Sequence, residues 1–320
     1  MDLNVVPKSH PLTGCIAKYQ RAQFHYDTLR SEIEKRYGGD DALPTFTMER
    51  GLDPDNPRVF RWAVSSFDEP PLEWATIVGD VVHNLRSSLD HLVYELSFLG
   101  TRGKPGEKTA FPCALTKKSW NNNDTQQVKL QGVLERHKKK LYTAQPSYRR
   151  RDDASPGAFD LRRHNALWVL HELSNDDKHR MLLPVKTCIT NLEFVVVGST
   201  DCRLVSGAPK WNPASFGRPL ELGSEIISIE IERTGPNPDV DVRFTIDSAI
   251  ALQDGVALVP RLANTANSVR EIVSWFSYEF ETKSAMSLWN LDRLGRVRPA
   301  KVISRKKLVL TPFQVQGRDL

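Results

Sequence analysis

Two short stretches of this chain carry most of the polar side chains whose spacing could support chemistry. The first, GDVVHNLRSSLDHLVYEL, covers residues 79–96, and the second, HELSNDDKHR, covers residues 171–180. A histidine with a pKa near neutrality can take a proton from a hydroxyl or give one to a leaving oxygen, and an arginine can hold a phosphate. Arg86 and His91, five positions apart, are therefore candidates for acid–base chemistry on a phosphate ester, with Asn84 and Asp90 positioning them.

Helical geometry divides the first stretch into two faces. At about 100° per residue, one polar stripe runs along one side, and Arg86 and Asp90 are offset from Asp80 by about 120° and 80°. The stripe consists of Asp80, His83, Asn84, Ser87, His91 and Tyr94. His83 and His91 are about 12 Å apart along the axis, so a single metal ion cannot bind both.

The spacing of Arg86 and His91 resembles the signature of the HEPN family, in which four to six residues separate an arginine from a following histidine on a bundle helix. The family most often has Asn, Asp or His directly after the arginine, where this chain has Ser87. The resemblance implies a helical domain, a metal-independent endoribonuclease or RNA-binding protein in a defence or toxin context, no cofactor, and a homodimer.

A more literal resemblance joins the two stretches. The chain is similar to a group of uncharacterised bacterial proteins with the patterns GD-x-x-HNLRS-x-LDH and N-x-DKHR, which this sequence matches from Gly79 and from Asn175. That resemblance names no reaction, but it indicates that the stretches form one constellation. The second stretch is accordingly expected to pack beside the first, either orienting His91 or adding phosphate contacts, through Asp176, Asp177, Lys178, His179 and Arg180.

Two other interpretations remain open for the same residues. Two Asp-x-x-His pairs, Asp80 with His83 and Asp176 with His179, could face each other across helices as metal ligands. Alternatively, the polar groups form a buried network that fixes packing, and the protein is a non-catalytic scaffold or interaction module.

Positive charge is concentrated in two parts of the chain, residues 129–151 and the tail after Lys283, although the net charge is only +5. Residues 129–151 contain eight Lys or Arg against one acid, Glu135. Such blocks attract nucleic-acid phosphates by releasing counterions, while a solvated loop is the alternative. We expect RNA backbone to contact Lys138, Lys139, Lys140, Arg149, Arg150 and Arg151.

Hydrophobic periodicity predicts the elements that position these groups. Helices are expected over 12–37, 71–96, 125–140, 161–173 and 256–281, the second of them central because it is apolar on most sides. Ser174 and Asp177 have the form of a capping box, which predicts a new short helix at Asp176. Residues 45–49 and 59–67 favour a small inserted hairpin, and several short β-branched segments follow Pro184.

These elements predict an α+β fold: an N-terminal helical bundle, then a small antiparallel sheet and a C-terminal helix. The expected division is a helical domain over 1–184, a sheet with its packing helix over 185–283, and a basic extended tail over 284–320. No signal-peptide pattern, membrane-spanning run or paired cysteine motif is seen, so a cytoplasmic location is expected. The motifs GxSxG, HExxH and GxxxxGK[ST] do not occur, which argues against classical hydrolase and nucleotide-dependent chemistry.

Overall fold

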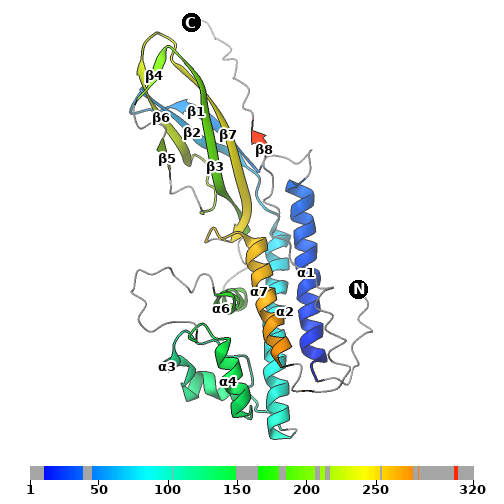
Figure 1. Ribbon diagram of the computed structural model, residues 1–320. Coiled ribbons are helices and arrows are strands. Elements are labelled where there is room, and N and C mark those ends of the chain that lie inside the picture. Colours follow the sequence, from blue (N-terminus) through cyan, green and yellow to red (C-terminus); the bar gives the residue numbers. More distant parts are fainter. Residues whose placement is uncertain are drawn as a thin grey trace. The chain divides into compact units, whose positions relative to one another are not determined.

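A computed structural model gives the α+β fold that the sequence predicts, with antiparallel sheets and a C-terminal helix. It describes residues 11–38, 45–102, 104–148, 165–179, 185–205, 210–212, 217–252, 254–276, 280 and 306–308, with only the backbone at 178, 179 and 306–308. The chain divides into two compact units (Figure 1). The helical unit takes its described residues from 11–30, 72–183 and 259–276, and the sheet unit takes them from 31–71, 184–258 and 306–308.

The longer helices overlap the predicted ones, although the helix predicted over 161–173 begins at Ala166 and ends at His179. They are α1 (Thr13–Tyr37), α2 (Leu72–Thr101), α6 (Ala166–His179) and α7 (Leu258–Trp275). Helix α2 is the core of its unit, since Val78, Val82, Leu85, Leu89 and Leu92 on several sides of it are fully buried. None of the described helices combines the length and apolarity that crossing a bilayer requires.

The single helix predicted over 125–140 is wrong. The structure has a short α3 (Lys117–Trp120), a π-helical turn (Asn123–Gln127), a 3-10 turn (Val128–Leu130) and then α4 (Glu135–Thr143). Gly132 has a φ of +81°, and Leu134 is extended with a ψ of 144°, so the backbone cannot stay helical between Leu130 and Glu135. Side chains before and after this break therefore do not share one helix face.

The new helix predicted at Asp176 is also absent, because α6 continues through Ser174 to His179. Ser174 is buried within the helix, so it does not act as a cap. The cap of α6 is Asn165, whose Oδ1 accepts hydrogen bonds from the backbone N–H groups of Leu167 and Trp168, both at 3.1 Å.

The sheet unit contains two antiparallel sheets. One has the order β1 (Phe46–Leu52), β2 (Val59–Phe67), β6 (Glu225–Arg233) and β4 (Cys202–Leu204), with β5 (Lys210–Trp211) also pairing with β6. The other has the order β3 (Val185–Thr200), β7 (Asp239–Leu252) and β8 (Lys306–Leu308). Alternating burial along β2 and β6 turns their apolar side chains to the inside.

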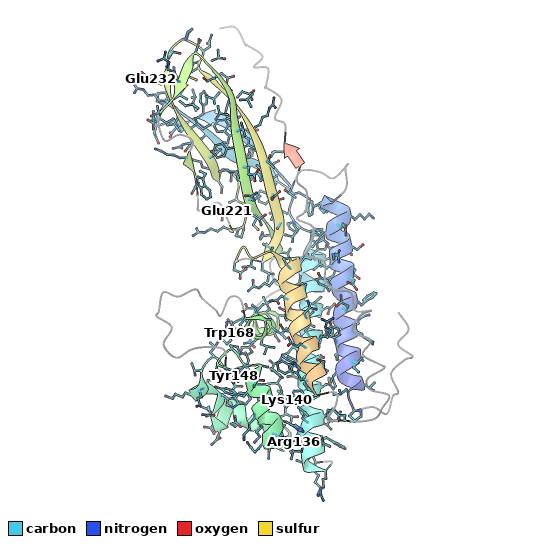
Figure 2. The ribbon with its side chains drawn as sticks, in the orientation of Figure 1. Arg136, Lys140, Tyr148, Trp168, Glu221 and Glu232 are labelled. Carbon is cyan, nitrogen blue, oxygen red and sulfur yellow. The ribbon has the colours of Figure 1, made fainter. Side chains whose placement is uncertain are left out.

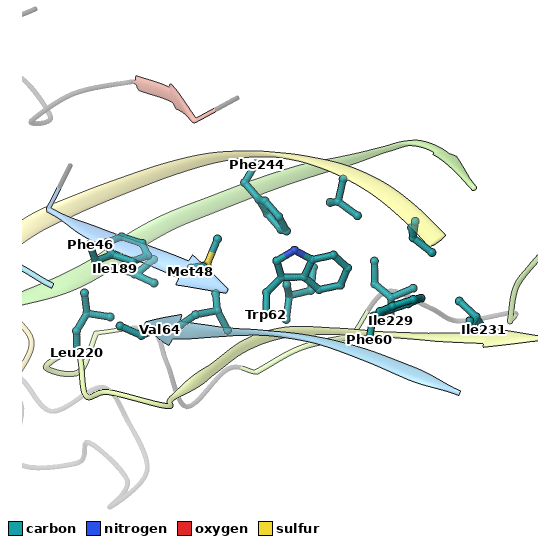
Figure 3. Packing of buried hydrophobic residues seen from close by; sticks show 14 of the residues in the cluster. Phe46, Met48, Phe60, Trp62, Val64, Ile189, Leu220, Ile229, Ile231 and Phe244 are labelled. Atoms are coloured by element: carbon teal, nitrogen blue, oxygen red, sulfur yellow. The ribbon is translucent and has the colours of Figure 1, made fainter. Parts of the chain in front are cut away.

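The core of this unit lies between the sheets, as in a β-sandwich. Trp62 of β2 meets Phe244 of β7 with ring centroids 5.7 Å apart, and Phe60, Ile229 and Met48 pack beside them (Figure 3). Residues far apart in the sequence thus form one apolar cluster, which explains why the early hairpin belongs here.

The predicted hairpin is confirmed, but its place in the fold differs from the expected division. Residues 46–67 pair with β6 in the sheet unit, and residues from Val259 in α7 belong to the helical unit. Neither unit is therefore one continuous stretch of chain. Of the predicted tail, only 306–308 are described, and they pair with β7.

Candidate nucleic-acid interface

Arg86 and Asp90 of α2 bind the backbone of an irregular segment around Phe111. The Arg86 guanidinium donates to the Phe111 carbonyl, and the Phe111 N–H donates to Asp90 Oδ1 at 2.7 Å. Arg86 and Asp90 also pair with each other at 3.3 Å, and the Arg86 side chain is only 12% exposed. Buried peptide groups outside helices and sheets need such partners, so this pair has a clear structural role.

Other polar groups complete the attachment of the same segment. The Ala114 N–H donates to Gln145 Oε1 at 2.9 Å, and the Ala114 carbonyl accepts from the Ser147 N–H at 3.1 Å. Burial raises the pKa of the neighbouring Cys113 thiol to about 12, so this cysteine stays protonated near neutral pH. Burial, followed by the positive charge of Arg86, lowers the pKa of Lys129. Lys129 therefore lies near the Arg86 side chain.

Much of the polar stripe of α2 faces α1. Asn84 is buried; its Nδ2 donates to the Asp80 carbonyl at 2.8 Å, and Lys18 Nζ donates to its Oδ1 at 3.5 Å. Asp80 Oδ2 lies 3.9 Å from Nδ1 of His25 on α1. Ser88, also buried, donates to the Cys15 carbonyl at 2.9 Å. These bonds fix how the two helices pack.

His91 lies on a different side of α2 from Arg86. A Cβ added at Gly14 in the first turn of α1 would be 3.0 Å from His91 Nδ1, whereas Arg86 reaches Phe111. Five residues turn a helix by about 140°, which agrees with these different neighbours. Within one chain, the two predicted catalytic side chains are therefore not brought together.

The second polar stretch does pack on the first, at Gly79. A Cβ at Gly79 would be 2.5 Å from Asp177 Oδ1, so only glycine admits this contact between α2 and α6. Gly79 is about 18 Å along the helix axis from His91, so Asp177 cannot orient that histidine. The side chains of His179 and Lys178, and all of Arg180, lie outside the described residues.

The described part of the structure does not bring the predicted metal ligands together. Asp80 faces His25, and the exposed His83 has its Nε2 3.5 Å from Ser87 Oγ. Among the described side chains, no group of three or more His, Cys, Asp or Glu lies close enough to hold a metal ion. The side chain of His179, the partner proposed for Asp176, is not among those described.

The three lysines predicted to contact RNA have different surroundings. Lys140 Nζ donates to the Trp275 carbonyl at 2.6 Å near the end of α7 and lies 5.1 Å from the Phe276 ring centre, so it is a structural residue (Figure 2). Lys138 pairs with Glu135 at 2.8 Å, and Lys139 is exposed. Arg149, Arg150 and Arg151 lie outside the described residues.

A groove between α3 and α4 contains residues that the sequence analysis missed. We call it the α3–α4 groove; its volume is about 310 Å³, and Lys138, Lys139, Glu135 and Gln127 contribute to its lining together with Trp120, Tyr142, Asn121 and Asn123. Trp120 and Tyr142 have ring centroids 5.1 Å apart, and Tyr148 meets Tyr142 at 5.5 Å. The clue in the sequence was aromatic residues interleaved with amides and basic residues between 120 and 148.

Comparisons with known proteins add no family to this geometry. Protein-family models, curated proteins and solved structures each gave no match to the chain.

Proposed function

We propose that this protein binds RNA through the basic segment of residues 115–148. The observation that supports the proposal is the concentration of charge. The segment holds seven Lys or Arg against Asp124 and Glu135, a net charge of +5 that equals the net charge of the whole chain. Four of these cations, Lys117, Lys118, Arg136 and Lys139, are exposed. Exposed cations at this density bind phosphates with little desolvation cost.

The test is binding of a labelled single-stranded RNA, measured by fluorescence anisotropy over a range of salt concentrations. The triple variant Lys117→Gln, Lys118→Gln, Lys139→Gln should lower affinity about tenfold and reduce the salt slope by about 2, because three phosphate contacts are lost. The control variant Arg21→Gln, Arg30→Gln, Lys35→Gln removes the same charge from the exposed surface of α1. Equal losses in the two triple variants, or no binding by the wild type, would reject the proposal.

RNA cleavage by Arg86 and His91, implied by the HEPN resemblance, is separate from this proposal. Its test is cleavage in EDTA by the wild type and by His91→Ala, since metal-independent acid–base catalysis requires the imidazole. Cleavage that is lost in His91→Ala would support it, and cleavage that is absent or survives would reject it. The implied homodimer also stays a prediction, which light scattering after gel filtration checks.

A further inference from the structure

We infer that the α3–α4 groove recognises an unpaired nucleobase together with the phosphate beside it, so that the protein selects single-stranded over duplex RNA. This inference rests on the proposed function and names the feature of RNA that the site reads. The groove joins three kinds of group that an unpaired nucleotide needs: aromatic rings, cations and amides.

The aromatic part is a row formed by Trp120 and Tyr142, which line the groove, and by Tyr148, which contacts Tyr142 from outside the lining. Trp120 is 7% exposed and supports the partly buried Tyr142, while Tyr148 is 54% exposed and presents its ring to solvent. Contacts within the row, at 5.1 and 5.5 Å, limit the orientations open to the outer rings. A preformed ring of this kind can stack a base without first being ordered.

The cations lie beside this row. Lys138 and Lys139, adjacent on α4, line the same groove as Tyr142, so a phosphate held by them is close to a base that contacts Tyr142. Asn121 and Asn123 also line the groove; they are exposed and carry amide donors and acceptors suited to base edges. A groove of about 310 Å³ is small for a duplex, whose base faces are in any case covered by stacking.

Among the described residues that line the groove, Glu135 is the one acidic residue, and its replacement should strengthen binding. Its carboxylate pairs with Lys138 at 2.8 Å, and that ion pair lowers the pKa of Glu135, so the side chain is charged near neutral pH. It repels an incoming phosphate and competes for Lys138. Glu135→Gln should therefore tighten RNA binding about threefold, although most substitutions in a binding site weaken binding.

The experiment compares one single-stranded RNA of mixed sequence with the same sequence in a duplex, using the full chain. Wild type should prefer the single strand at least tenfold, and Tyr148→Ala should lower single-strand affinity about fivefold while leaving duplex affinity unchanged. Tyr148 is exposed, so its loss should leave the fold intact; Tyr148→Phe, which keeps the ring, should restore binding.

Each outcome decides the inference. Binding of single strand and duplex with equal affinity, unchanged in Tyr148→Ala and Glu135→Gln, would overturn the inference while leaving general RNA binding in place. Absence of all RNA binding would reject the proposed function as well. Tighter binding of a poly-glutamate peptide than of RNA would also overturn the inference, because the groove would then be a site for acidic proteins.

Discussion

On α2, the side chains of Arg86, Asp90 and Asn84 bond to backbone groups or neighbouring side chains, whereas Lys117, Lys118 and Lys139 in the α3–α4 region are exposed to solvent. Both regions are rich in charged and amide residues. The first uses them to hold an irregular segment and a helix pair, and the second leaves them open to a ligand. Polar content alone therefore does not identify a site; the partners of each polar atom do.

The largest expected effect is a loss of folding stability when Arg86 on α2 is replaced. Arg86→Ala should cost about 3 kcal/mol in the free energy of unfolding, because it leaves a buried carbonyl and the carboxylate of Asp90 without their cation. Urea denaturation measures it. The exposed His83→Ala on the same helix should change stability by about 0.5 kcal/mol or less. Similar values for the two variants would contradict the structural role of Arg86.

A smaller effect distinguishes two consecutive lysines. Lys140→Gln should lower stability by about 1.5 kcal/mol, since its ammonium bonds the Trp275 carbonyl, and should leave RNA affinity nearly unchanged in the folded protein. Lys139→Gln should do the reverse, keeping stability and weakening RNA binding about twofold to threefold. Thermal melts and anisotropy on the same two samples check both; identical profiles would remove the distinction.

The contact between α2 and α6 gives an effect of about 1 kcal/mol. Gly79→Ala should have a net destabilising effect of about that amount, because the new Cβ forces Asp177 to move. The higher helix propensity of alanine offsets part of this cost. Combining it with Asp177→Ala should restore stability, and the double-mutant cycle measures the coupling. Simple addition of the two effects would show that these residues do not meet.

The smallest expected effect depends on pH. Burial, partly offset by the carboxylate of Asp80, lowers the pKa of His25 below its ordinary value of 6.5. The folded state then binds fewer protons than the unfolded state, so stability is full above pH 6.5 and falls as pH drops through the folded pKa. His25→Gln should flatten this part of the stability–pH curve. An unchanged curve would show that another group titrates.

The sequence predicted the helices and strands better than it predicted which residues contact one another. Apolar periodicity was enough for α1, α2 and α7, because each buries one or more regular stripes. It failed between Leu130 and Glu135, where Gly132 interrupts the helix through a backbone conformation that hydrophobic patterns do not encode. The hairpin was visible, yet its pairing with β6 depends on a contact more than 150 residues away.

The candidate site shows the same contrast between residues that the sequence identified and contacts that it did not. The sequence identified Asn84, Arg86 and Asp90 as candidate site residues. Their partners Lys18 and Phe111 lie in distant segments, and local sequence patterns do not show which distant residues will be in contact. Tyr142 and Tyr148 were missed because their relation to Trp120 exists only after the chain turns between α3 and α4.

The most direct test of the central claim is ultraviolet cross-linking of a single-stranded RNA containing 4-thiouridine, followed by mass spectrometry of the linked peptides. RNA binding at this segment predicts cross-links in residues 115–148, foremost at Tyr142, which lines the groove with Lys138 and Lys139, and at Tyr148, which contacts Tyr142. Cross-links centred instead on the exposed His83 and His91 of α2, with none in 115–148, would contradict it.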